Sequence, residues 1–572
     1  MITYSISARS LFLTTMIALS LSGATALAAP QTANVPEAGI AVGGYRIAGT
    51  VVSKTDGHPL AQARISVRDV KGGQPRWLIT SEDGKFEFSG LAAGKYSLVG
   101  QKRGFVPAAY DQHDQFSTAI VTGAGLETET LVLRLAPMAI IAGKVLDEFG
   151  DPVRNATVTS YYDDHSGGVD QIRPSHTTQT DDQGSYEITS LTPGTFFISA
   201  SAKPWYAVHP NSTPPNSTPA NSNSTDSGSQ DQSEATANVD RSLDVAYPVT
   251  YYSDVTEADD ATPIPIRGGE HLQMDIHLNP VPSLRLLFRV PKNENNGFEF
   301  PRLEQPTFDG STFLQSDGVR MVSPGLVEVT GIPAGRYNVH IDGQGAGIQM
   351  NGVELGKDGE EIDTSSGEAL SNVNFSAQMQ GDIALPEHLA VGLRSGHRLL
   401  AGWQQFDAKG KAELSRMPAG RYEVLLWGTP KPYSIAHMVN DGASITGHWL
   451  TVAAGSAPSV SLTLIGGSSD IEGTAKRAGK PFAGAMVVLV PKNPDLDRDL
   501  FRRDQSDLDG TFALRNVVPG SYTILAIENG WDLDWSQPGV IAVYVPHGRK
   551  IEVGSQGSRA MNLAEGVEVQ SK

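Results

Sequence analysis

Residues 509–524 read DGTFALRNVVPGSYTI, and this stretch predicts two β-strands bounded by turns. An Asp-Gly pair favours a turn, after which Phe512 and Leu514 alternate with residues of the opposite strand face. A Pro-Gly pair turns the chain again, and Tyr522 and Ile524 resume the alternation. We therefore expect a β-hairpin whose apolar side chains face a core.

The same pattern recurs four more times along the chain. The other copies lie at residues 83–98, 182–196, 326–337 and 407–422. Each has a glycine just before the second strand, at positions 94, 194, 335 and 420, corresponding to Gly520 in the last copy. Five copies of one pattern indicate five copies of one structural unit.

Two more strands precede the hairpin in the best-preserved units. In the first unit, residues 47–52 form a G-x-V strand pattern, and residues 59–67 form a P-x-x-x-A pattern that ends in alternation. Both recur at 141–158 and at 471–488. Short strands with a turn about every 8–12 residues and no helical periodicity indicate a small antiparallel β-sandwich. We expect an all-β chain of about five such sandwiches in a row.

The order of these patterns resembles the carboxypeptidase regulatory-like domain of secreted bacterial repeat proteins. This domain is a transthyretin-like sandwich, related to the B-type repeats of collagen adhesins and classified beside carbohydrate-binding folds. The resemblance covers the first, second and fifth units well, and the third and fourth mainly through their P-A-G-R-Y turns. It implies an accessory domain, because the zinc-binding catalytic domain of carboxypeptidases has no counterpart here.

These patterns divide the chain of 572 residues, which is too long for one hydrophobic core, into eight segments. They are a signal peptide at 1–28, a leader at 29–43, sandwiches at 44–136, 137–280, 281–379, 380–466 and 467–556, and a tail at 557–572. The third and fourth sandwiches are divergent. Residues 211–238 of the second are small or polar, and we expect this insertion to be disordered.

The N-terminal residues predict export. Arg9 precedes an apolar run from Leu11 to Leu21, and residues 26–28 read ALA, as at a signal-peptidase site. The alternative is an uncleaved anchor, but the run is shorter than the roughly 20 residues of a membrane span. We expect a secreted or periplasmic protein, or one at the cell surface, without a membrane span after cleavage.

The amino-acid composition of the chain limits the kinds of partner and cofactor that we expect. The chain has no cysteine, which excludes disulfides and thiolate metal sites. Its 63 acidic and 44 basic residues give a net charge of −19 without a basic block, which argues against binding to nucleic acid. No hydrolase signature and no phosphate-binding loop is present, so we expect no enzyme and no cofactor other than calcium.

Two groups of residues are candidate sites. Asp504, Asp507 and Asp509 form an oxygen-rich loop that could hold Ca²⁺, although Asp-Gly is also an ordinary turn. Aromatic rings beside carboxylates could stack on sugars, although such rings also cap the ends of sandwiches. The candidate sugar-binding residues are Trp531, Trp535, Asp532, Asp534, Trp205, Tyr206, Tyr251 and Tyr252.

The expected function is that of a non-catalytic scaffold, adhesion or ligand-binding module. One alternative is carbohydrate binding through the loop aromatics. Another is an accessory role to a secreted enzyme or to an outer-membrane transport system. The expected partner is accordingly a glycan or a cell-surface or periplasmic protein.

Overall fold

The structure, a computed structural model, describes residues 43–572 except 124, 210–239, 291–299, 315, 342–346, 382, 397, 429–432, 446, 468 and 555–559. The expected signal peptide and the expected disordered insertion therefore lie outside the described residues. Among the described residues, strands form nine sheets, and none of the helices is long and apolar enough to cross a membrane. The all-β prediction is confirmed.

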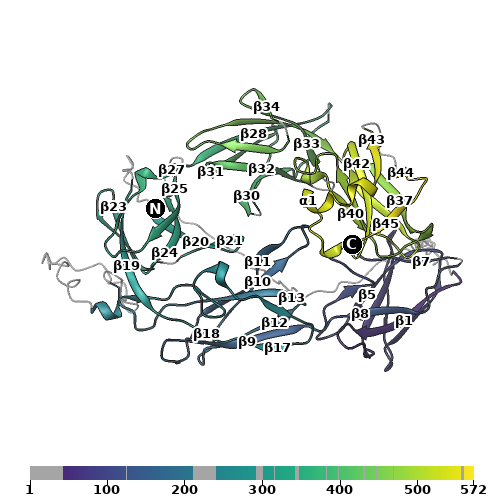
Figure 1. Ribbon diagram of the computed structural model, residues 1–572, viewed down its shortest axis with the longest axis horizontal. Helices are drawn as coiled ribbons and strands as arrows, with labels where there is room; N and C mark the ends of the chain where they lie inside the picture. Colours follow the sequence, from purple (N-terminus) through teal and green to yellow (C-terminus); the bar gives the residue numbers. More distant parts are fainter. Residues whose placement is uncertain are drawn as a thin grey trace, which may run out of the picture. The chain divides into compact units, whose positions relative to one another are not determined.

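Each of five sandwiches pairs two layers of strands around its own core (Figure 1). The first sandwich contains β1 (Tyr45–Ser53), β2 (Arg64–Asp69), β3 (Arg76–Ile79), β4 (Lys85–Leu91), β5 (Gly94–Gln101), β6 (Ala108–Ala109), β7 (Ile120–Thr122) and β8 (Leu131–Leu135). The second contains β9 (Ala139–Leu146), β10 (Thr157–Asp164), β11 (Gln171–Gln179), β12 (Ser185–Leu191), β13 (Gly194–Ser201), β15 (Thr250–Tyr251), β16 (Ile264–Ile266), β17 (His271–Gln273) and β18 (Ile276–His277).

The third and fourth sandwiches follow the same plan. The third contains β14 (Val245–Ala246), β19 (Val281–Arg289), β20 (Pro301–Thr307), β21 (Gly310–Phe313), β22 (Gly318–Ser323), β23 (Leu326–Pro333), β24 (Gly335–Ile341), β25 (Ile348–Leu355), β26 (Glu361–Asp363) and β27 (Glu368–Ala369). The fourth contains β28 (Ser371–Met379), β29 (Ala390–Ser395), β30 (Arg398–Gln405), β31 (Lys411–Met417), β32 (Gly420–Trp427), β33 (Tyr433–Asn440), β34 (Ala443–Ile445), β35 (Trp449–Val452) and β36 (Ser459–Gly466).

The fifth sandwich extends to the C-terminal residues. It contains β37 (Ser469–Arg477), β38 (Lys480–Pro481), β39 (Met486–Pro491), β40 (Arg502–Gln505), β41 (Thr511–Val517), β42 (Gly520–Glu528), helix α1 (Pro538–Ile541), β43 (Arg549–Val553), β44 (Met561–Asn562) and β45 (Val567–Ser571). β45 pairs in parallel with both β37 and β42, and its Val567 and Val569 are buried. The prediction of a separate tail at 557–572 is therefore wrong, because this short alternating segment completes the last sandwich.

The repeated pattern is not a hairpin, although its strands lie where the sequence predicts them. In all five copies, the strand before the Pro-Gly turn pairs with the first strand of the unit, as β41 does with β37. The strand after the turn pairs with the second strand of the unit in the opposite layer of the sandwich, as β42 does with β39. The turn thus carries the chain from one layer to the other. Alternation shows which face of a strand is buried but not which strand is its neighbour.

A backbone irregularity precedes the crossing in every copy. The residue four positions before the turn glycine has a positive φ, and the pairing register shifts beside it. These residues are Gly90, Ser190, Gly331, Arg416 and Asn516, with φ between 54° and 81°. A bulge of this kind bends the strand and changes the direction of the chain, so the chain leaves its layer within a few residues.

In four of the five copies, a tyrosine just after the turn donates a hydrogen bond back to a carbonyl at the start of the turn. The hydroxyl of Tyr522 donates to the carbonyl of Val518 at 2.7 Å, and Tyr96, Tyr337 and Tyr422 donate in the same way to the carbonyl four residues upstream. Phe196 occupies this position in the second sandwich. The tyrosine ring fills the core while its hydroxyl satisfies a carbonyl of the turn.

Candidate functional site: the junction between the first and fifth sandwiches

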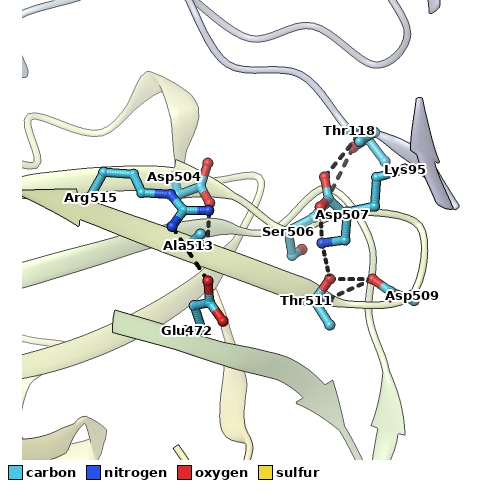
Figure 2. Close-up of polar contacts among 11 residues, drawn as sticks. Lys95, Thr118, Glu472, Asp504, Ser506, Asp507, Asp509, Thr511, Ala513 and Arg515 are labelled. Carbon is cyan, nitrogen blue, oxygen red and sulfur yellow. Dashed lines mark hydrogen bonds and ion pairs between the residues drawn. The ribbon is translucent and has the colours of Figure 1, made fainter. Parts of the chain in front are cut away.

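Asp507 has a different role from its counterparts in the other sandwiches. Asp181, Asp407 and Asp507 each lie three residues before the glycine of the first turn in the repeated pattern, which is Gly184, Gly410 or Gly510. The carboxylates of Asp181 and Asp407 accept N–H groups of their own turns at 2.8 Å. The Asp507 carboxylate instead accepts the N–H of Ala119 at 2.9 Å and the ammonium of Lys95 at 2.6 Å, both in the first sandwich (Figure 2). Residues 43–572 form a single compact unit, and these contacts lie within it.

The turn around Asp507 is also held by apolar and backbone contacts. The side chain of Leu508 packs against the hydrophobic core of the first sandwich, and its N–H donates to the carbonyl of Ala119 at 3.1 Å. The corresponding turn positions carry Glu82, Asp182 and Ala408. An apolar residue at a turn tip that is polar or small elsewhere is the one sequence signal for this junction.

Beside this turn, Gln505 reaches into the first sandwich. Its amide nitrogen lies 2.8 Å from the hydroxyl of Thr118 and 2.5 Å from the carbonyl of Asp111. Gln505 is only 1% exposed, so these partners replace water for its amide. Sequence reasoning missed Lys95, Thr118 and Gln505, because each is an ordinary polar residue within its own repeat.

The three aspartates expected to bind calcium serve three separate purposes. Asp504 accepts the N–H of Ala513 at 2.6 Å, Asp507 binds the first sandwich, and Asp509 accepts the N–H of Thr511 at 3.0 Å. In Figure 2, Asp504 lies apart from Asp507 and Asp509. Among the described residues, these three are not brought together as a group of possible metal ligands.

Burial sets the electrostatics of this acidic segment. It raises the pKa of Asp504 to about 6, and the backbone N–H groups that it accepts only partly oppose that shift. Burial also raises the pKa of Asp507, against the opposing effect of the Lys95 ammonium. Protonation of this segment therefore begins at mildly acidic pH.

One group of described residues has the composition of a metal site. His165 and Asp170, at the tip between β10 and β11, lie with Asp534 so that one possible ligand atom from each is within 4.8 Å of the others. Asp170 is 69% exposed, and its carboxylate is 2.6 Å from His165 Nδ1. A protonated His165 accounts for this ion pair without a metal ion.

The tryptophans expected to bind sugar instead contact neighbouring sandwiches. Trp531 stacks on His113 of the first sandwich, with ring centroids 5.0 Å apart and an interplanar angle of 6°. The Trp535 ring lies 4.2 Å from the Arg503 guanidinium carbon and packs against Gly168 of the second sandwich. Both rings are partly buried in this way. Between them, Asp532 forms an ion pair with the Lys572 side chain, and Asp534 lies near His165.

The aromatic residues of the second sandwich divide in the same way. Tyr251 is 1% exposed and packs against Phe308 of the third sandwich, so its ring is not available to a ligand. Tyr252 packs against the core of the second sandwich, and the Tyr206 hydroxyl donates to Glu148. Trp205 is 89% exposed. Of the eight residues expected to bind sugar, Trp205 is the one whose ring lies open to solvent.

Comparison with known proteins identifies the first two units. Residues 46–132 and 140–220 match the carboxypeptidase regulatory-like domain, which covers two of the three units where the sequence predicts it. A search of curated proteins gave no match.

The similar solved structures, pilins among them, have very low sequence identity to this chain. The full-length major pilin RrgB of Streptococcus pneumoniae is 8% identical, with 92% of this chain and 99% of that chain covered and a TM-score of 0.16. The Bacillus anthracis TIE protein is 9% identical, with 73% of each chain covered and a TM-score of 0.17. The minor pilin GBS52 of Streptococcus agalactiae is 12% identical, with 42% and 97% covered and a TM-score of 0.21. At these TM-scores the likeness carries no argument about function. The match to the family model is the finding that identifies part of the chain: residues 46–132 and 140–220 are two carboxypeptidase regulatory-like domains.

Proposed function

We propose that this protein is a non-catalytic, secreted or periplasmic scaffold that presents tandem β-sandwiches at the cell surface for adhesion or ligand binding. The proposal rests on one observation: residues whose identity or partners differ between the copies form contacts between sandwiches. Leu508 and Trp531 depart from the repeat, Asp507 keeps the residue of the repeat but has different partners, and all three join the fifth sandwich to the first. Residues of this kind hold sandwiches together rather than assemble a reactive centre.

Binding of the purified mature chain to isolated cell envelopes tests the scaffold role. We expect saturable binding that survives the substitution Asp504→Asn, which leaves the junction contacts of Asp507 in place. Hydrolysis of general peptide, ester or glycoside substrates by the same preparation, at rates above a heat-treated control, would overturn the proposal.

Carbohydrate binding is the second candidate function, and the exposed Trp205 favours it. The neighbouring residues Lys203 and Pro204 line a cleft of about 490 Å³, together with Tyr247, Phe313 and other residues of the second and third sandwiches. An exposed aromatic face beside a cleft of mixed polar and apolar lining is suited to stacking on a sugar ring.

A glycan array distinguishes this candidate from a scaffold without a sugar site. Specific hits should be lost in Trp205→Ala and retained in Trp427→Ala, since Trp427 is also exposed but lies in the fourth sandwich. Hits that survive Trp205→Ala would exclude the cleft beside this residue as the sugar site.

A further inference from the structure

A buried histidine between the fourth and fifth sandwiches hydrogen-bonds a carbonyl through one ring nitrogen and lies at ion-pair distance from a carboxylate at the other. His448 Nε2 is 3.0 Å from the carbonyl oxygen of Ile435, and Nδ1 is 3.1 Å from the carboxylate of Asp499. Neither oxygen can donate a proton, and a neutral imidazole has only one N–H. The arrangement therefore fits the doubly protonated, positively charged ring.

The carboxylate that faces His448 belongs to the neighbouring sandwich. Asp499 lies in the 3-10 turn Arg498–Leu500 of the fifth sandwich, and it also accepts the hydroxyl of Ser434 at 2.6 Å. Two side chains of the fourth sandwich thus converge on one carboxylate of the fifth. The His448 side chain is 6% exposed, so solvent screens the pair weakly.

The surrounding charges favour protonation of His448. Burial alone would lower its pKa, but Asp499, the Ile435 carbonyl and the more distant Asp497 outweigh burial, and the pKa lies above the ordinary value. The positive charge of Arg502 helps to keep that carboxylate ionised, because it lowers the pKa of Asp499.

The same arrangement recurs between the second and third sandwiches. His209 is 5% exposed, with Nδ1 at 2.7 Å from the carboxylate of Asp244 and Nε2 at 2.9 Å from that of Asp317. Lys203 also pairs with Asp317. Burial opposes the charged form of His209, but the two carboxylates outweigh it and raise the pKa.

We infer that His448 and His209 are proton-operated latches that hold neighbouring sandwiches together at mildly acidic pH and release them as the pH rises. A histidine whose pKa is raised in the latched state contributes its full stabilisation below the ordinary pKa of about 6.5. The contribution is lost as the pH rises through the raised value. Each unit of pKa difference between latched and released states changes the ratio of the two about tenfold.

Distance measurements between spin labels test the latch directly. The chain has no cysteine, so the double variant Lys409→Cys and Lys480→Cys carries one label on the fourth sandwich and one on the fifth, both at exposed positions. We expect one narrow distance distribution at about pH 6 and a second, broader population at about pH 8.5, about tenfold more abundant than at the lower pH if the pKa is raised by one unit. The same labels in His448→Gln should give distributions that do not change with pH.

Two further variants separate the latch from general effects of pH and of folding. His277→Gln removes an exposed histidine that pairs with Asp254, and it should leave the pH response intact. Asp499→Asn keeps the size of the side chain but removes its charge, and it should abolish the response even if His448→Gln does not fold. The inference is overturned if the unsubstituted histidine gives the same distribution at both pH values, or if Asp499→Asn retains the full response.

Discussion

The hydroxyl of the turn tyrosine makes a small contribution to stability, and the same hydrogen bond occurs in four of the five sandwiches. Tyr522→Phe keeps the ring in the core but leaves the Val518 carbonyl without its donor at 2.7 Å. We expect the fifth sandwich to lose about 1 kcal/mol, the usual net value of such a bond, as the second sandwich already tolerates Phe196.

Hydrogen exchange of β42 amides, read by mass spectrometry, measures this loss. A decrease of about 1 kcal/mol in the free energy of opening corresponds to roughly fivefold faster exchange. Exchange in β24 of the third sandwich, where Tyr337 makes the equivalent bond, should stay unchanged and serves as the internal control. Equal exchange rates in β42 of the two proteins would show that the hydroxyl contributes nothing.

A second prediction at the scale of one residue concerns Asp504. Because burial raises its pKa to about 6 from an ordinary 3.8, ionisation above pH 6 destabilises the fold, and stability from this group increases as the pH falls from 6 toward 3.8. Asp504→Asn stays neutral and still offers an oxygen to the N–H of Ala513. At pH 7.5 we expect the variant to be more stable by about 1–3 kcal/mol, with a smaller gain at pH 4.5. Thermal melting at the two pH values measures this difference, and a loss of stability at pH 7.5 would contradict it.

At the scale of the element, the crossing depends on the residue with positive φ that precedes it. Gly331 has φ of 81°, and an added Cβ would lie 2.6 Å from a carboxylate oxygen of Asp317. Gly331→Ala should therefore destabilise the third sandwich by at least the roughly 1–2 kcal/mol that a left-handed conformation costs a residue with a side chain. Gly356→Ala in the same sandwich is the matched control, because nothing lies within 4 Å of the Cβ it would add. Calorimetric melting of both variants compares them, and an equal effect would remove the special role of the bulge.

The elements were largely predictable from the sequence, and their pairing was not. Alternation of apolar residues around Phe512 and Tyr522 locates β41 and β42, although burial alternates only in β41, where Phe512 and Leu514 are buried, and is continuous through the middle of β42. The same alternation is compatible with a hairpin and with a chain that crosses from one layer to the other. Only the bulge at Asn516 distinguishes these two arrangements. Asn tolerates positive φ, but a lone Asn is too common in sequences to mark a bulge.

At the scale of the whole molecule, the residues of the candidate sites contact residues of distant sandwiches, and a local sequence pattern does not show such contacts. Trp531 is a candidate sugar-binding residue from the sequence, and its partner His113 lies in a sandwich more than 400 residues earlier in the chain. Asp507 is a predicted calcium ligand because its loop is acidic, and in the structure its carboxylate pairs with Lys95, an ordinary strand residue. Long-range docking is set by complementary surfaces, and one chain's sequence does not show which surfaces meet.

Leu508 gives a prediction about that docking. Leu508→Asp places a charge against the hydrophobic core of the first sandwich and should release this junction without unfolding either sandwich. Ala408→Asp is the matched control, since it introduces the same charged side chain at the equivalent, exposed turn of the fourth sandwich. Limited proteolysis should cut Leu508→Asp faster than Ala408→Asp within residues 111–119, which contact the fifth sandwich at the junction. Equal cleavage of the two variants would argue against a docking role for Leu508.

Zero-length carbodiimide crosslinking of the unmodified protein tests the central claim, that the distinctive turn of the fifth sandwich docks on the first. The Lys95 ammonium and the Asp507 carboxylate are 2.6 Å apart, close enough to be coupled directly to an amide. Mass spectrometry should find a peptide pair that joins Lys95 to Asp507, beside the pair Lys572 to Asp532 within the fifth sandwich as positive control. A Lys572–Asp532 link without a Lys95–Asp507 link would contradict the account.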